Sequence, residues 1–233
     1  MTMSLISFGL IAFALINNEP VFILVQRAES IPYILFVTNS LHRVVTPIEN
    51  VISTMTNQEK ELLLQNKEPL IQPLVEKYRH QLEEKTDAVL EWSLPKGRKG
   101  RKETVSHGVS IAVREFEEET IFKKKHIEYI FKNDVYGYTK TGTDNKKYSY
   151  ILYPAVVNVS SLLKLCEKNI SSAQVENPKD LCIIFPNKTN ETSNVSLMGI
   201  NKIKTEKGIT SELRDFIVTV YNDIVKLSRL VAH

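Results

Sequence analysis

Four of the five charged residues at positions 114–119 have the types and the spacing that metal-dependent chemistry requires. Arg114 precedes Glu115, and Glu118 and Glu119 follow one helical turn later. On a helix that turns 100° per residue, the three glutamates fall within a sector of roughly 100°. Like charges this close repel one another, and a bound Mg²⁺ or Mn²⁺, which prefers hard oxygen ligands, would relieve that repulsion. The spacing therefore predicts a metal site.

The simpler interpretation of such a motif is a solvated acidic helix face. Two neighbouring features weigh against it. Val109, Val113 and Phe116 cluster on another side of the same helix, where they would anchor it to a core. A loop rich in glycine and lysine comes directly before the helix. A helix held in this way would present its carboxylates at a fixed place.

That loop carries a dense run of basic residues. Its cations are Lys96, Arg98, Lys99, Arg101 and Lys102. Beside an acidic helix, such a loop can attract phosphate groups, and a solvated flexible loop is the alternative. Lys77, Arg79 and His80 would extend the same basic track.

The elements before the acidic helix follow from periodicity and turn signals. Thr56 to Glu59 is a capping-box pattern, and Leu74, Tyr78 and Leu82 recur at helical spacing. We expect two strands within 3–27 joined by a turn, a short strand at 30–38, helical structure at 40–87, a strand at 89–94, a loop at 95–106 and a helix that ends near Thr120.

The elements after the acidic helix alternate between strand and helix. We expect strands at 127–139 and 147–157, a helix at 160–168, an ambiguous segment at 183–186, a strand at 195–198 and a long amphipathic helix from Ser211. Strands precede, surround and follow the central helix. The predicted class is therefore α/β (α+β), with a mixed β-sheet sandwiched between helices.

Composition narrows the class of protein further. Apolar residues make up 42% of the 233 residues and charged residues 24%, which is typical of a soluble globular domain. The net charge of +3 is too mild to argue for nucleic acid by itself. The apolar run from Leu5 to Ile16 is too short to span a bilayer. With only Cys166 and Cys182, whose spacing does not indicate a disulfide, we expect free thiols in a reducing compartment.

The region 97–122 resembles the Nudix box, G-x5-E-x7-R-E-U-x-E-E-x-G-U, in which U is bulky and apolar. Residues 114–119 match R-E-U-x-E-E at every defined position, and Gly97 and Glu103 match G-x5-E. Ten residues instead of seven separate Glu103 from Arg114, and Ile121 stands where the box has its last glycine. The role of Glu103 is therefore open, and the helix should end differently, because glycine is the usual C-terminal cap.

The resemblance implies a Nudix fold and a set of site residues. Glu115, Glu118 and Glu119 would bind Mg²⁺ or Mn²⁺, with Glu115, Glu119 and Arg114 also catalytic. Glu191, which precedes a late strand, would be a further metal ligand. Lys96 and Gly97, in a W-x-x-P-K-G sequence, would contact phosphate together with the cations of the loop. The reaction would be attack of water on phosphorus, promoted by the metal.

The rest of the chain is similar to the mRNA-decapping Nudix enzymes of large cytoplasmic DNA viruses, of the African swine fever virus type and more distantly of poxviruses. This resemblance implies a Nudix domain at 1–38 and 88–233, with a helical insertion at 39–87 as a candidate RNA-binding subdomain. The substrate would be capped RNA, cleaved to m7GDP and 5′-monophosphate RNA in the host cytoplasm, promoting host shutoff. Trp92, Tyr33 or Tyr138 could stack on a base, although each is better explained by core packing.

Two alternatives stay open. The same cations would serve a diphosphoinositol polyphosphate or dinucleoside polyphosphate as substrate. The chain could instead be an inactive RNA-binding protein with a degenerate box, because Ile121 and the longer spacing depart from the pattern. The oligomeric state is open.

Overall fold

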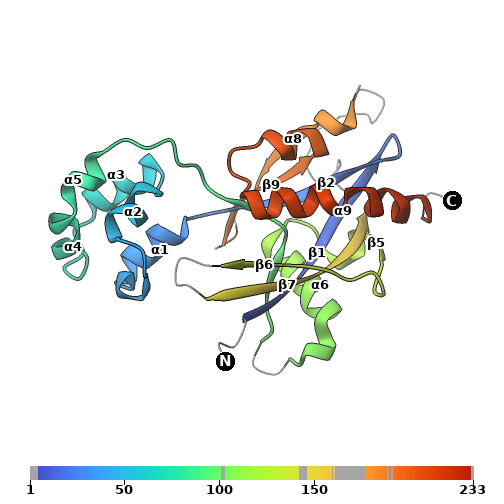
Figure 1. Ribbon diagram of the computed structural model, residues 1–233, viewed down its shortest axis with the longest axis horizontal. Helices are drawn as coiled ribbons and strands as arrows, with labels where there is room; N and C mark the ends of the chain where they lie inside the picture. The colour runs from blue at the N-terminus through green and yellow to red at the C-terminus, as the bar shows by residue number, and fades with distance from the viewer. Residues whose placement is uncertain are drawn as a thin grey trace.

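A computed structural model describes residues 5–100, 103–141, 146–158, 160, 177–187, 189 and 191–231. Within these ranges the strands form one nine-stranded sheet whose main path runs β5-β7-β1-β2-β9-β8. Figure 1 shows the sheet and its covering helices as one body, with a separate helical unit, α1 to α5, beside it.

The first two strands form the predicted hairpin. β1 (Leu5–Ile16) pairs antiparallel with β2 (Glu19–Arg27), and Ile16 lies opposite Glu19. The two turn residues, Asn17 and Asn18, have φ of 50° and 62°. Asparagine tolerates this left-handed conformation, which two-residue hairpin turns require. Both strands are nearly all apolar because both faces of the sheet are covered.

The remaining strands assemble around this hairpin. β7 (Lys147–Val157) runs parallel to β1 along its length, while β9 (Thr192–Met198) pairs antiparallel with β2 and β8 (Cys182–Pro186) with β9. β5 (Ile127–Ile130) and β6 (Tyr136–Thr141) pair with β7, β3 (Trp92–Ser93) with β2, and β4 (Lys96–Arg98) with β1. The sheet is therefore mixed.

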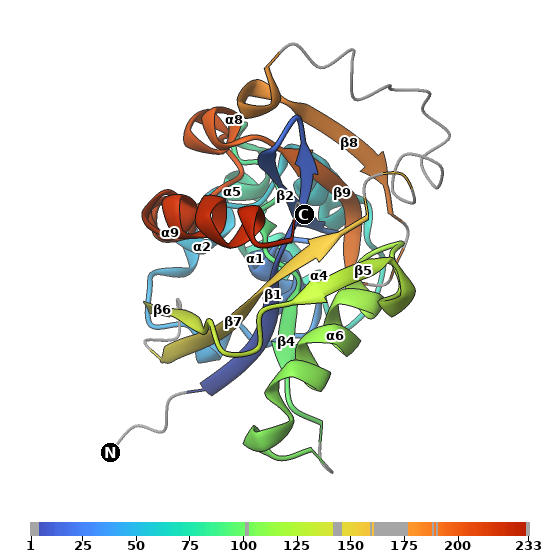
Figure 2. The ribbon, with the colours of Figure 1, turned by 90° about the vertical axis from the view of Figure 1, so that its right-hand side faces the viewer.

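Helices cover both faces of the sheet, as Figure 2 shows. α6 (Gly108–Glu119) packs on one face through Ile111, Ala112 and Phe116. α8 (Ile200–Thr205) and α9 (Ser211–Arg229) pack on the other through Ile203, Phe216 and their neighbours. The predicted class, a mixed sheet between helices, is confirmed. None of the described helices is long and apolar enough to cross a membrane.

The helical unit has its own apolar core. It consists of α1 (Ile31–Val37), η1 (Leu41–Arg43), α2 (Ile48–Ser53), α3 (Asn57–Gln65), α4 (Gln72–Lys77) and α5 (Arg79–Glu83). Phe36, Met55 and Leu63 are fully buried within it. The capping box of Thr56 and Glu59 is present. The division of the chain into domains at residues 38 and 88 stays a prediction.

One predicted strand is wrong. Residues 30–38 contain helix α1, because the Ser30 hydroxyl accepts a hydrogen bond from the Tyr33 amide and Pro32 lies in the first turn. Ser30 is thus an N-cap and Pro32 a helix starter, which outweighs the β-type composition of the segment. Phe36 then packs into the helical core rather than into the sheet.

Other boundaries also differ from the prediction. The segment at 127–139 is two strands, because a break at residues 131–135 separates β5 from β6. The strand expected at 89–94 is only Trp92–Ser93, and the expected loop at 95–106 contains β4 and the short η2 (Val105–His107). The segment at 183–186 belongs to β8. The helix expected at 160–168 lies outside the described residues, apart from Ser160.

Candidate active site

Helix α6 carries the predicted carboxylates over one face of the sheet. Phe116 and Ile111 on its inner side are fully buried against the core, so the helix is fixed in rotation. This rotation leaves Glu115 only 7% exposed, while Glu118 faces solvent. The core packing therefore decides which of the three carboxylates is desolvated.

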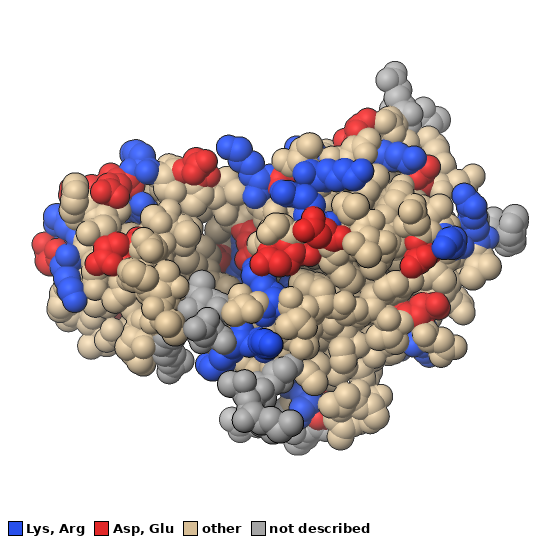
Figure 3. All heavy atoms as spheres, viewed as in Figure 1, with Lys and Arg blue, Asp and Glu red and all other residues tan. Residues whose placement is uncertain are grey.

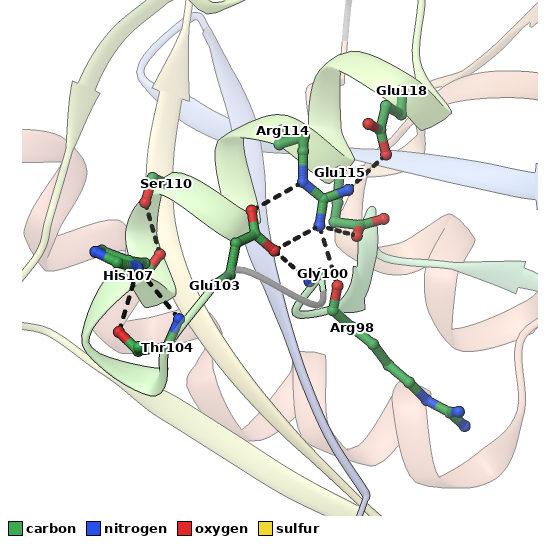
Figure 4. Close-up of polar contacts among 9 residues, drawn as sticks. All are labelled: Arg98, Gly100, Glu103, Thr104, His107, Ser110, Arg114, Glu115 and Glu118. Carbon is green, nitrogen blue, oxygen red and sulfur yellow. Dashed lines mark hydrogen bonds and ion pairs between the residues drawn. The ribbon is translucent and has the colours of Figure 1, made fainter.

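Arg114 is the hub of the site, as Figure 4 shows. Its guanidinium lies 2.8 Å from Glu115 Oε1, 2.7 Å from Glu118 Oε2 and 3.2 Å from Glu103 Oε1. Its Nη2 also donates to the Arg98 carbonyl oxygen at 3.0 Å. One planar cation thus joins the acidic helix to the basic loop, a geometry that the fork of donors on arginine allows.

Glu103 supports Arg114. Its carboxylate accepts hydrogen bonds from Nε and Nη2 of Arg114 and from the Gly100 amide. The Gly100 amide and then Arg114 hold the pKa of Glu103 below its usual range. The three extra residues before Arg114 are absorbed by the loop and η2, so the longer spacing does not remove Glu103 from the site.

Gly97 makes room for Glu115. A Cβ atom at Gly97 would overlap the Glu115 carboxylate. Strand alternation turns position 97 toward α6, since Gly97 pairs with Phe8 of the α6 face. The glycine is therefore required by the close approach of a carboxylate.

Glu119 is the most strongly perturbed acid of the site. Its pKa is raised to about 7, chiefly by burial and to a lesser extent by the charges of Glu115 and Glu191. Lys96 opposes this shift, and its backbone amide donates to Glu119 Oε2 at 2.9 Å. Burial also raises the pKa of Glu115. Carboxylates that are costly to ionise in this way are typical of sites that receive a cation.

Glu191 lies at the same end of the helix, although it is exposed. The loop before β9 is tied to α6, because Asn187 Nδ2 and Thr192 Oγ1 donate to the Glu119 carbonyl oxygen at 2.6 and 2.8 Å. Asn187 and Thr192 are buried. Sequence reasoning missed both residues, because nothing in the sequence connects them with a helix end about 70 positions earlier.

These two donors also explain how α6 ends without a glycine. Thr120 adopts extended backbone geometry, with φ −126° and ψ 164°, and its amide donates to the Phe116 carbonyl oxygen. The last carbonyl groups of the helix therefore find partners in Thr120, Asn187 and Thr192 rather than in a left-handed cap. The different helix end expected from Ile121 is observed.

The donor set fits a divalent cation. Glu115, Glu119 and Glu191 supply hard carboxylate oxygens whose mutual repulsion a cation would offset. In the part of the chain that the structure describes, no three acidic, histidine or cysteine side chains lie close enough together to hold a metal ion as they stand. Instead Arg114 forms an ion pair with Glu115, and the Lys96 amide donates a hydrogen bond to Glu119. Metal binding would use these same oxygens.

The predicted phosphate-binding residues take different positions. Lys96 Nζ lies 5.2 Å from the centroid of the Tyr150 ring, and burial lowers its pKa. Arg98 and Lys99 are exposed. Arg101 and Lys102 lie outside the described residues. Figure 3 shows acidic and basic side chains gathered where the helical unit meets the sheet.

The other candidate binding residues are accounted for by packing or pairing. Trp92 is 2% exposed in the core. Tyr33 packs against the helical core, and Tyr138 lies beside Phe216 with ring centroids 4.9 Å apart. On the insertion, Arg79 pairs with Glu76 and His80 lies 3.6 Å from Glu84.

Comparisons with known proteins give only a distant likeness. No family model matches the chain, and no curated protein matches it. Two crystal structures of C. elegans Ap4A hydrolase are similar. One, a binary complex, has 13% identity and a TM-score of 0.46 over 98% of each chain. The other has 12% identity and a TM-score of 0.44 over 98% of this chain and 100% of that one. Similarity at this level does not support assigning a function to this chain.

Proposed function

We propose that this protein is a Nudix-type pyrophosphohydrolase that uses Mg²⁺ or Mn²⁺ to cleave a phosphoanhydride bond. One observation carries the proposal. The buried Glu115 and the partly buried Glu119, which accepts from the Lys96 amide, lie near the exposed Glu191 at one end of α6. This combination of acidic ligands and a phosphate-binding strand suits hydrolysis of a polyphosphate.

In this proposal each residue has a separate task. Glu115, Glu119 and Glu191 hold the cation, with Glu118 at the exposed end of the same face. Arg114 and Glu103 orient Glu115. When bound, the metal polarises a phosphoryl oxygen and lowers the pKa of a water molecule. Glu119 or Glu115 takes the proton from the attacking water, and Lys96 contacts a phosphate group.

We propose capped RNA as the substrate, cleaved to m7GDP and 5′-monophosphate RNA in the cytoplasm, as in viral decapping enzymes. The basic residues after Lys96 support a long polyanion, because Arg98 and Lys99 follow it on β4 and the adjoining loop and both are exposed. Dinucleoside or diphosphoinositol polyphosphates are the alternative substrates.

The test uses purified protein, cap-labelled RNA and Mg²⁺ or Mn²⁺. Glu119→Gln is the inactive variant. Glu117→Gln is its matched control, because Glu117 lies on the same helix but accepts a hydrogen bond from the Lys124 amide instead of facing Lys96. We expect m7GDP from the wild type and Glu117→Gln only.

Two other results would change the proposal. Cleavage of dinucleoside or diphosphoinositol polyphosphates with no m7GDP would retain the hydrolase and replace its substrate. Absence of hydrolysis of all three substrates with either metal would overturn the enzyme proposal and leave an RNA-binding protein.

A further inference from the structure

The face of the sheet opposite α6 carries an unusual group of side chains. Strand alternation turns Lys96 and Arg98 to this face, whereas Gly97 between them faces Glu115. Figure 4 shows the Arg98 side chain pointing away from Arg114 while its carbonyl oxygen accepts from that residue. The Arg98 side chain therefore lies away from the acidic face, whereas the charge of Lys96 still acts on Glu119.

Three tyrosines lie on the same face. Tyr150 lies opposite Tyr138 in the β6–β7 register, with ring centroids 4.6 Å apart. Arg98 Cζ lies 5.7 Å from the centroid of the Tyr148 ring, and Lys96 Nζ lies 5.2 Å from that of Tyr150. Each cation thus lies over a different ring within the range of cation–π attraction. We call Lys96, Arg98, Tyr138, Tyr148 and Tyr150 the tyrosine–cation platform.

Small residues of β1 make the platform continuous. β1 runs between β4 and β7, and at this point it contributes Ser7 opposite Arg98 and Tyr150, and Gly9 opposite Lys96. A larger side chain at Gly9 would collide with Pro95 and Lys96. The cations can therefore reach across β1 to the rings of β7.

The platform lies partly open beside the carboxylates. α9 covers Tyr138 through Phe216, whereas Tyr148 and Tyr150 are partly exposed and Arg98 is exposed. Among the described strands β4 pairs with β1 on one side. The Lys96 amide meets Glu119 at 2.9 Å. The strand that carries the two cations therefore also contacts a carboxylate of the proposed metal site.

We infer that the tyrosine–cation platform binds the nucleoside end of the substrate, with phosphates on Lys96 and Arg98 and the base stacked on Tyr148. This inference rests on the proposed function. Cations two residues apart on one strand face are roughly 6.6 Å apart, so they contact a chain of phosphates rather than one group. Aromatic rings and the plane of an arginine both stack on bases. An inositol polyphosphate has no aromatic group for these rings.

The experiment compares two ligands that share a chain of three phosphates, GTP and inorganic tripolyphosphate. Binding is measured by calorimetry in EDTA, so that hydrolysis plays no part. We expect the wild type to bind GTP about tenfold more tightly than tripolyphosphate. Tyr148→Leu should remove this preference and leave tripolyphosphate binding unchanged, whereas Tyr148→Phe should retain the preference. Tyr129→Leu is the matched control, because Tyr129 is 51% exposed on β5.

A wild type without preference for GTP, or a Tyr148→Leu variant that retains it, would overturn the inference. Since that variant could fail to fold, wild-type protein is also irradiated with 8-azido-GTP and digested. Labelling of β6 or β7 supports the platform, and labelling confined to other segments refutes it. A preserved GTP preference in a protein without hydrolytic activity would reject the proposed function alone.

Discussion

Replacing Glu119 by Gln should change how the stability of the metal-free protein depends on pH. Burial raises the pKa of Glu119 from 4.5 to about 7. The folded state thus keeps this proton up to about pH 7, while the unfolded chain loses it near pH 4.5. The resulting stabilisation is fully present below pH 4.5 and is lost as the pH rises through 7.

The size of the effect follows from the shift in pKa. At about 1.4 kcal/mol per pKa unit, the wild type should lose roughly 3.5 kcal/mol of folding free energy from this group across the window. Glutamine does not ionise and can still accept from the Lys96 amide. The difference in stability between Glu119→Gln and the wild type should therefore grow by about 2 to 3 kcal/mol between pH 5 and pH 8.

The assay is urea unfolding in EDTA at pH 5, 6, 7 and 8. Glu49→Gln on α2 is the control, because Glu49 is exposed on the helical unit and its curve should parallel the wild type. Saturating Mg²⁺ or Mn²⁺ at pH 8 should stabilise the wild type by more than Glu119→Gln. Parallel pH curves for Glu119→Gln and wild type would refute the raised pKa of Glu119.

Three further predictions test the surroundings of these carboxylates. Gly97→Ala should lower kcat about 10- to 100-fold, because the added Cβ displaces the Glu115 carboxylate. Gly100→Ala, whose Cβ would meet Glu103 at 3.2 Å, should have a smaller effect. Equal effects of the two variants would contradict the close approach of Glu115 to Gly97. Arg114→Lys should lower activity more than tenfold, since an ammonium group cannot bridge Glu103, Glu115 and Glu118 together. Circular dichroism should show intact folding. Near-normal turnover would show that the bridging role of Arg114 is dispensable. Asn187→Ala should destabilise the protein by about 1 to 3 kcal/mol, because it removes a buried donor to the Glu119 carbonyl oxygen. It should also weaken Mn²⁺ binding measured by calorimetry. Unchanged Mn²⁺ affinity would show that this loop does not support the metal site.

Local signals in the sequence predicted much of the molecule. The hairpin of β1 and β2, the capping box at Thr56, helix α6 and helix α9 all follow from apolar periodicity and turn residues, which act over a few positions. The carboxylates of 115–119 share one face for the same reason. Where two local signals competed, as at residues 30–38, the caps at Ser30 and Pro32 outweighed composition.

Long-range contacts decided the rest. The sequence could not show that Asn187 and Thr192 hold the end of α6, that Gly97 faces Glu115, or that Ser7 and Gly9 leave space between Arg98 and Tyr150. These relations depend on which strands pair and in which register, and a shift of one residue turns each side chain to the other face. The sequence determined which groups are available for chemistry, and the pairing of β4 and β7 with β1 determined which groups meet.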